Sequence, residues 1–162
     1  MLQTLKKKMA QDRQQDEGFT LIELMVVVLI IAVLLAIAIP TFLGSQNKAK
    51  DRSAQSSLRN TLTAAKTIYT DGADYTKVTV GTGGTLPATE PSLTFVDTAT
   101  ASSDPKTVSI NAASASTFYA AAMSKSGTCY YIKDSATSGT SYGTGTTCTG
   151  TAAASGTYTS SW

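Results

Sequence analysis

Few residues in this 162-residue chain have side chains that could perform chemistry. The chain has no histidine, so a His-dependent catalytic triad, an imidazole base or a His-ligated metal site cannot form. Its two cysteines, Cys129 and Cys148, are too few to complete a tetrahedral thiolate site. The sequence therefore predicts no catalytic residue, no metal site and no cofactor, and it directs attention to the few charges that lie in unusual surroundings.

The charge composition also excludes one class of partner. Lys and Arg total 13 and Asp and Glu total 11, which gives a formal net charge of +2. Nucleic-acid binding depends on a concentrated positive potential, so we predict no direct nucleic-acid partner. The residue types are instead segregated: 24–39 are sixteen apolar residues in succession, whereas 24 of the 28 residues in 135–162 are Ser, Thr, Gly or Ala.

The long apolar run predicts a membrane-spanning helix over residues 19–43. Glu23 is the only charged residue in this segment, and 25 helical residues reach about 38 Å, more than the roughly 30 Å of a bilayer's hydrocarbon core. Residues 1–18 carry three consecutive lysines, which favour a cytoplasmic leader. A removable secretory signal is the alternative, but its apolar core spans about 7–15 residues and ends at a small-residue cleavage site. Here Pro40-Thr-Phe-Leu-Gly follows the run instead.

The helix is expected to continue beyond the apolar segment, through residues 44–75. No proline lies between Thr41 and the turn signal Asp71-Gly72, so we predict one helix from about Phe19 to Thr70. Its second half is amphipathic and needs a sheet to cover its apolar stripe. The stripe consists of Ala54, Leu58, Leu62, Ala65 and either Ile68 or Tyr69.

Residues 76–162 are predicted to supply that sheet. The tail after Asp134 is too poor in apolar side chains to form a core of its own, so it must lie on the sheet or remain mobile. Segments 81–91 and 97–105 are predicted loops. The fold class is therefore α+β, with a long N-terminal helix packed on a small antiparallel sheet. The predicted strands are 76–80, 92–96, 106–110, 117–124 and 128–133, the last two joined by a hairpin at Lys125-Ser126-Gly127.

The string Gly18-Phe19-Thr20-Leu21-Ile22-Glu23 lies between the basic leader and the apolar run. From about Lys6 to Tyr75 the chain resembles the type IV pilin family, whose precursors carry this junction. The resemblance implies that prepilin peptidase cuts between Gly18 and Phe19 and that Phe19 becomes the N-methylated first residue. The apolar helix, left in place by such a cut, would anchor the mature chain.

The resemblance also implies where the chain acts and with what partners. The subunit would wait in the cytoplasmic membrane, with its N-terminus inside and its C-terminus outside, and then polymerise with copies of itself into a helical extracellular pilus. Further implied partners are the pilus assembly platform, its motor ATPases and minor pilins. The biological role of the filament is not encoded in these residues.

Two residues of the apolar helix have predicted roles in the filament. An ionised Glu23 near the start of a spanning helix can sit close to the interface, and the α-amino group of Phe19 on a neighbouring subunit is a cation that could pair with it. The resemblance implies the same role in setting subunit register; the alternative is a Glu that merely starts a helix. Pro40 cannot donate a hydrogen bond to the carbonyl of Ala36, so a kink or local melting is expected there, and the resemblance implies unwinding within a filament.

Cys129 and Cys148 form an even pair in the part of the chain that is predicted to lie outside the membrane. Thiols oxidise there, so we expect a disulfide, and the resemblance points to the C-terminal disulfide loop of pilins. Two free or redox-active thiols are the alternative reading. The absence of a C-x-x-C pair argues against it.

Other functions compete with that of a pilus subunit. A major pseudopilin of a type II secretion system would share residues 18–40, and a membrane-anchored binding module would use the helix only as a tether. Asp71 and Asp74 offer oxygens to calcium but lack EF-hand spacing. The remaining candidates are the triplets that penicillin-binding enzymes use, present here from Ser45 to Lys48, at Ser109-Ile110-Asn111 and at Lys125-Ser126-Gly127, which arise readily by chance in a Ser-rich chain.

Overall fold

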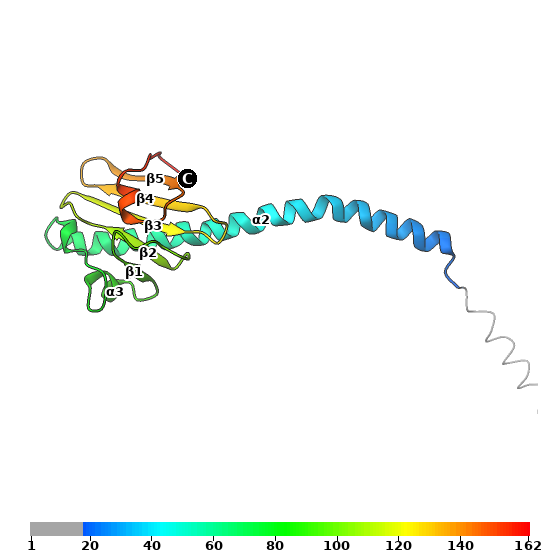
Figure 1. Cartoon of the computed structure of the whole chain (residues 1–162), viewed down its shortest axis with the longest axis horizontal. Helices are drawn as coiled ribbons and strands as arrows, with labels where there is room; N and C mark the ends of the chain where they lie inside the picture. The colour runs from blue at the N-terminus through cyan, green and yellow to red at the C-terminus, as the bar shows by residue number, and fades with distance from the viewer. Residues whose placement is uncertain (1–17) are drawn as a thin grey trace, which may run out of the picture. The chain divides into compact units, whose positions relative to one another are not determined.

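The computed structural model describes residues 18–162 and combines one long helix with a five-stranded sheet, which confirms the α+β class (Figure 1). The predicted leader residues 1–17 lie outside the described residues. The chain divides into two compact units, with the boundary between Leu43 and Gly44. The elements are α2 (Leu21–Thr70), the 3-10 helix η2 (Tyr75–Lys77), α3 (Thr85–Thr89), β1 (Thr94–Val96), β2 (Thr107–Asn111), β3 (Thr117–Met123), β4 (Cys129–Ser135), β5 (Gly139–Gly145) and α4 (Gly150–Ala154).

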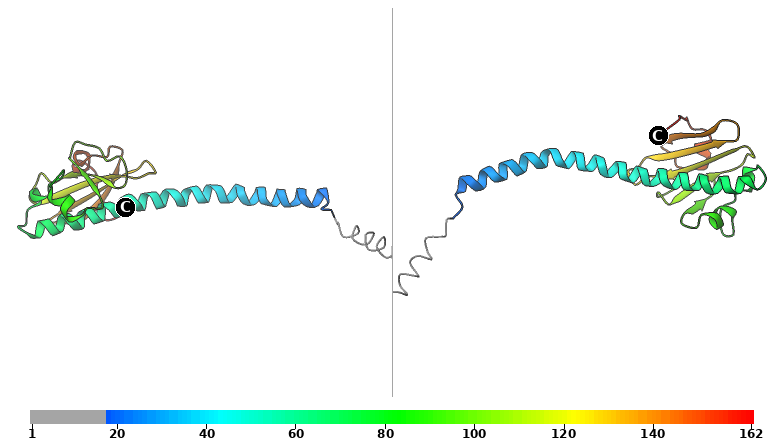
Figure 2. Two further views of the ribbon diagram at one scale, coloured as in Figure 1. Left: turned by 90° about the horizontal axis from the view of Figure 1, so that it is seen from below. Right: turned by 180° about the vertical axis from the view of Figure 1, so that it is seen from behind.

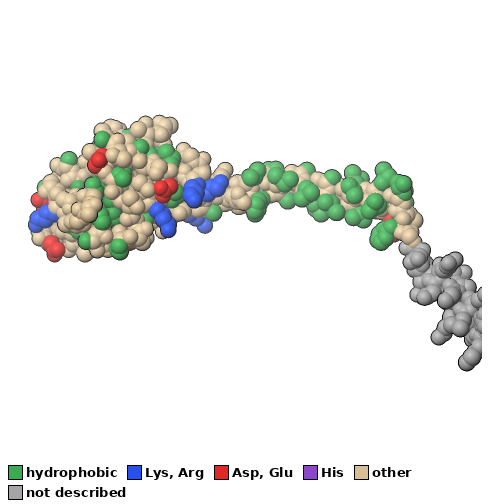
Figure 3. Space-filling model, turned by 60° about the horizontal axis from the view of Figure 1, so that its bottom comes forward, with side chains coloured by type: hydrophobic (Ala, Val, Ile, Leu, Met, Phe, Trp, Pro, Cys, Tyr) green, Lys and Arg blue, Asp and Glu red, His purple; other side chains and the backbone are tan. Residues whose placement is uncertain are grey.

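In the first unit, helix α2 begins at Leu21, two residues after the predicted start, and carries apolar side chains on all sides. This half of α2 contains a stretch that is long and apolar enough to cross a bilayer. Its large apolar side chains are exposed, from Leu21 to Leu43, and they cover the described part of the unit in the space-filling view (Figure 3). A helix that is apolar all round requires lipid or other helices as its surroundings.

In the second unit, the amphipathic half of α2 lies along one face of the sheet (Figure 2). The predicted stripe is confirmed, because Ala54, Leu58, Leu62, Ala65 and Ile68 are all buried. Alternation along the strands supplies the opposite side of this core, since successive strand residues point to opposite faces. The sheet residues in contact with this core are Phe95, Val108, Ile110, Phe118, Ala120, Ala122, Tyr130 and Ile132.

The strands follow chain order, β1-β2-β3-β4-β5, with antiparallel pairing from β2 to β5. The expected β3–β4 hairpin is confirmed, with Met123 opposite Cys129 and Gly127 at a φ of 93° in its turn. The expectation of a wholly antiparallel sheet is wrong at one edge, because β1 pairs with β2 in parallel. The loop from 97 to 106 carries the chain back to the end of the sheet at which β1 began. Strand β2 therefore runs in the same direction as β1.

The Ser/Thr/Gly-rich tail forms a regular strand, which the sequence did not predict. Strand β5 pairs along the full length of β4, from Gly139 opposite Ser135 to Gly145 opposite Cys129. Its glycines allow close packing: a Cβ at Gly145 would lie 2.2 Å from the hydroxyl of Tyr131, and one at Gly143 would lie 2.5 Å from a backbone oxygen. Low apolar content therefore reflects backbone pairing and close approach rather than a mobile tail.

Two further expectations are wrong between the helix and β1. Residues 76–80 do not form a strand, because Asp74 accepts hydrogen bonds from the backbone N–H and hydroxyl of Thr76 and caps η2. Thr85 donates its hydroxyl to the carbonyl of Lys77, so side chains occupy backbone groups that a strand would pair. The predicted loop 81–91 contains the short helix α3, whose Leu86 is fully buried.

The Asp51 carboxylate fastens α2 to the β3–β4 hairpin. It accepts hydrogen bonds from the hydroxyl of Ser124, at 2.7 Å, and from that of Ser126. Burial opposes ionisation of this carboxyl, but its hydrogen bonds, together with the nearby charge of Lys50, hold the pKa of Asp51 below its usual value. The start of the second unit's helix is thus fixed to a turn more than seventy residues away in sequence.

The Asp134 carboxylate forms a second link, at the opposite end of β4. Lys66 of α2 forms an ion pair with it at 2.9 Å, Tyr75 donates its hydroxyl at 2.6 Å, and Thr140 of β5 donates at 2.6 Å. Burial of the Asp134 carboxyl works against ionisation, yet the three partners lower its pKa. One carboxylate therefore joins helix, η2 and two strands.

Candidate functional site

Residues 18–20 precede helix α2 and are not helical. All three are exposed, and the Phe19 side chain is 80% accessible. The peptide bond between Gly18 and Phe19 is thus on an accessible, non-helical segment directly before the apolar helix, with Glu23 lining the same hollow. A protease could reach this bond without first unwinding a helix.

Thr20 and Glu23 satisfy each other's backbone groups at the start of α2. The hydroxyl of Thr20 accepts from the backbone N–H of Glu23 at 3.2 Å, and the Glu23 carboxylate accepts from the N–H of Thr20 at 3.4 Å and from its hydroxyl at 3.1 Å. This reciprocal arrangement is a capping box, which pairs backbone donors that the first helical turn leaves unsatisfied. The helix start immediately after residue 20 follows from it.

The sequence prediction gave Glu23 a role in the filament and overlooked Thr20. The T-x-x-E spacing before an apolar run, which is typical of a capping box, is the signal that could have found it. Within the described residues the Glu23 carboxylate has only these bonds to Thr20, so it lies exposed at the helix start. It is therefore accessible to a charged group from another molecule.

Pro40 lies inside α2, and the helix is continuous through it. The carbonyl of Ala36 receives no hydrogen bond from position 40, since proline has no N–H. The next residue adds side-chain bonds, because the Thr41 hydroxyl contacts the carbonyls of Ile37 at 3.0 Å and Ala38 at 2.9 Å. Neither bond reaches the freed carbonyl of Ala36, and back-bonding of this kind often bends a helix. Melting at Pro40 under load stays a prediction.

The expected disulfide is confirmed: Cys129 and Cys148 are bonded, with Cα atoms 5.4 Å apart and a sequence separation of 19. It lies on the sheet face opposite α2, where Ala121, Tyr131 and Ala153 form a second small core. The bond joins the start of β4 to the segment between β5 and α4. It thereby fixes the Gly-rich tail to the sheet.

Replacing both cysteines by alanine should lower the free energy of unfolding by about 3 kcal/mol, because the unfolded chain gains conformational entropy when a loop of this length is no longer closed. Denaturant unfolding of the full chain in detergent, followed by near-ultraviolet circular dichroism, would measure the loss. Untreated native chain should resist alkylation of both residues until a reductant is added. Labelling of both thiols in folded, unreduced protein would contradict the disulfide.

The remaining chemical candidates have structural roles. Ser109 is fully buried; its hydroxyl donates to the carbonyl of Asp97 and accepts from the N–H of Gly150. Asp74 caps η2, and across residues 18–162 no three His, Cys, Asp or Glu side chains gather as a metal site would need.

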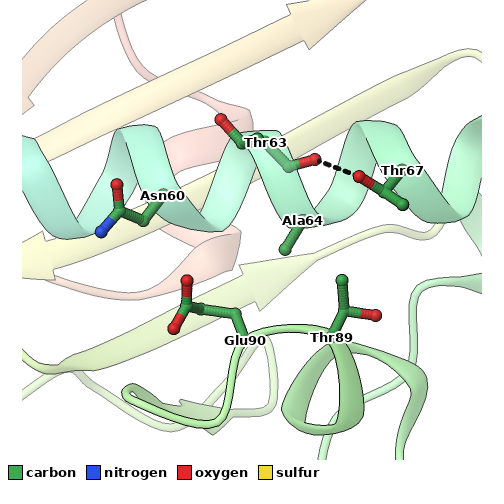
Figure 4. Close-up of a pocket in the computed structure, with 6 residues that line it drawn as sticks. All are labelled: Asn60, Thr63, Ala64, Thr67, Thr89 and Glu90. Atoms are coloured by element: carbon green, nitrogen blue, oxygen red, sulfur yellow. Dashed lines mark hydrogen bonds between the residues drawn. The ribbon is translucent and has the colours of Figure 1, made fainter.

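A pocket between α2 and the end of α3 has one carboxylate, Glu90, among small polar side chains (Figure 4). The other lining residues are Asn60, Thr63, Ala64, Thr67 and Thr89.

Comparisons with known proteins agree with the site at the helix start. A family model described as the prokaryotic N-terminal methylation motif matches residues 13–39. The type IV major pilin protein PilA of Myxococcus xanthus (strain DK1622) is 44% identical over 61 residues, which are 38% of this chain and 28% of that protein. The chain thus aligns with less than a third of that relative's length. No solved structure matches the chain.

Proposed function

We propose that the chain is a type IV pilin: prepilin peptidase cleaves it between Gly18 and Phe19, Phe19 is N-methylated, and the mature chain polymerises into a pilus. One observation carries the proposal: an exposed, non-helical Gly18-Phe19 bond directly precedes an apolar helix whose first turn bears a single carboxylate, Glu23. The chain then acts as a structural subunit and not as an enzyme.

The apolar half of α2 has two successive environments in this proposal. Before assembly, residues 19–43 span the cytoplasmic membrane, with the leader inside and residues 44–162 outside. In the filament the same side chains pack against those of neighbouring subunits. Both environments bury apolar surface that is exposed in the single chain, which stabilises each state by about 25 cal/mol per Å² relative to water. Cleavage before the helix, rather than after it, keeps this anchor.

Assembly requires partners besides the subunit itself. The peptidase recognises the segment around Gly18, and an assembly platform with motor ATPases extracts the mature chain from the membrane. Extraction moves a helix that is apolar on all sides from lipid to a protein bundle, so the helix is transferred between two apolar surroundings rather than through water. Minor pilins complete the proposed set of partners, and the final location is an extracellular filament.

We expect subunits from sheared surface filaments to begin at N-methyl-Phe19. Intact-mass and N-terminal fragment analysis would measure this directly, since removal of residues 1–18 and addition of one methyl group give a defined mass. Gly18→Leu should leave uncut precursor in the membrane because a bulky side chain precedes the cleaved bond, whereas Gly44→Ala, which lies beyond the apolar helix, should be processed normally. Filament subunits that begin at Met1 would overturn the proposal.

A further inference from the structure

We infer that a cluster of five cationic side chains at the start of the second unit docks that unit onto the headgroups of anionic phospholipids before assembly; the inference rests on the proposed membrane anchoring of α2. This cluster, the basic collar, gathers side chains from α2 and from two loops at one end of the unit (Figure 3). Its members are Lys50, Lys106 and Lys125, which line one groove, and Lys48 and Arg52, which flank Lys50 on α2.

The collar is a structured surface because its loops are fixed. Lys50, Lys106 and Lys125 line one groove together with one carboxylate, that of Asp104; the other lining residues are Ala49, Ser53 and Pro105. The lysine from the β3–β4 turn is held near α2 by the hydrogen bonds that Ser124 and Ser126 donate to Asp51. Three ammonium groups from separate parts of the chain therefore face one hollow.

The carboxylates near the collar are engaged by their own surroundings. Asp51 accepts from the two hairpin hydroxyls, and Asp104 accepts from the N–H of Lys106 at 2.8 Å and the hydroxyl of Thr107 at 2.7 Å. Among residues 18–162, the one ion pair is Lys66 with Asp134, so no lysine of the collar is paired. Five cations against two carboxylates leave a local positive excess that an external anion can neutralise.

The position of the collar along α2 identifies that anion. Residues 24–43 are 20 helical residues, about 30 Å, and match the hydrocarbon core if Glu23 lies at the inner interface. Lys48, Lys50 and Arg52 then lie about 7–14 Å along the helix beyond the outer boundary of the hydrocarbon core. This is within or just beyond the headgroup layer, which their long side chains can reach. Phosphate is the anion present at that depth.

The test uses the full chain in nanodiscs made either of phosphatidylcholine alone or of an equal mixture with phosphatidylglycerol. Amide hydrogen exchange in residues 103–107 and 124–128 should slow in the anionic discs and return to the faster rate in high salt, which screens the contact. Lys106→Gln and Lys125→Gln should each lose a factor of about five of this protection, the contribution of one lysine near an anionic surface. Lys77→Gln, which removes the same charge from η2, should lose none.

Several results would overturn docking on lipid. Equal exchange in both kinds of disc would do so, as would protection by inorganic phosphate added to phosphatidylcholine discs, because that would assign the groove to a free anion. Protection that appears only when two chains share a disc would assign the collar to a second copy. A chain that fails to enter discs at all would instead contradict the proposed anchoring, so the two failures are distinguishable.

Discussion

Cells that produce Glu23→Ala in place of the native chain are expected to have few filaments or none, although the precursor should still enter the membrane. Insertion loses a charge that costs about 2.5–3.5 kcal/mol at the centre of a spanning helix and less near its end. In the proposed filament, however, the Phe19 ammonium of a neighbour would remain buried without its partner, and breaking a buried ion pair costs about 3–5 kcal/mol. Electron microscopy of sheared material, with membrane pools compared by immunoblot, would measure both effects.

The capping box seen in the single chain offers a rival explanation for such a defect, and two variants separate the explanations. Glu23→Gln keeps a side chain that can cap the helix but removes the charge. Thr20→Val removes the hydroxyl of the cap but keeps the Glu23 carboxylate, at a cost of about 1 kcal/mol to the helix start. If charge pairing sets subunit register, Glu23→Gln is defective and Thr20→Val assembles. The reverse result would assign Glu23 to capping alone.

The elements that depend on local sequence pattern were predictable. The apolar run is long enough to predict a spanning helix, the stripe from Ala54 to Ile68 has a helical period, and Asp71-Gly72 ends the helix at Thr70 as expected. Strands β2, β3 and β4 contain the β-branched and aromatic side chains that favour strands. These features follow from neighbours in the chain and require no knowledge of distant contacts.

The features that sequence did not reveal depend on residues far apart in the chain. Strand β5 is held by pairing with β4, and two of its glycines are explained by distant residues: Gly145 by the side chain of Tyr131 and Gly143 by the backbone oxygen of Thr157. The parallel β1–β2 pair depends on the path of a loop. Within the candidate site the disulfide was predicted because an even cysteine pair has few alternatives. The Thr20–Glu23 box is an exception, since its signal was local and was overlooked.

The contact between Lys66 and Asp134 is another long-range feature, and it carries the second large expected effect. Asp134→Asn should lower the free energy of unfolding by about 2–4 kcal/mol at neutral pH. This is less than breaking a fully buried ion pair would cost, because the Asp134 side chain is 6% exposed but that of Lys66 is 48% exposed. Denaturant unfolding of the full chain in detergent would measure it. Tyr75→Phe, which removes one donor and keeps the ring, should cost about 1 kcal/mol.

The pH dependence tests whether the charge of Asp134 is responsible. Its pKa in the folded chain is below the unfolded value of about 3.9, so ionised Asp134 stabilises the fold above that value, and the contribution is lost as pH falls through the folded pKa. The stability difference between native chain and Asp134→Asn should therefore be constant near neutrality and shrink below about pH 4. Asp74→Asn, at an exposed cap, should show a much smaller difference. A difference for Asp134→Asn that does not change with pH would indicate that packing, and not charge, holds helix, η2 and strands together at this carboxylate.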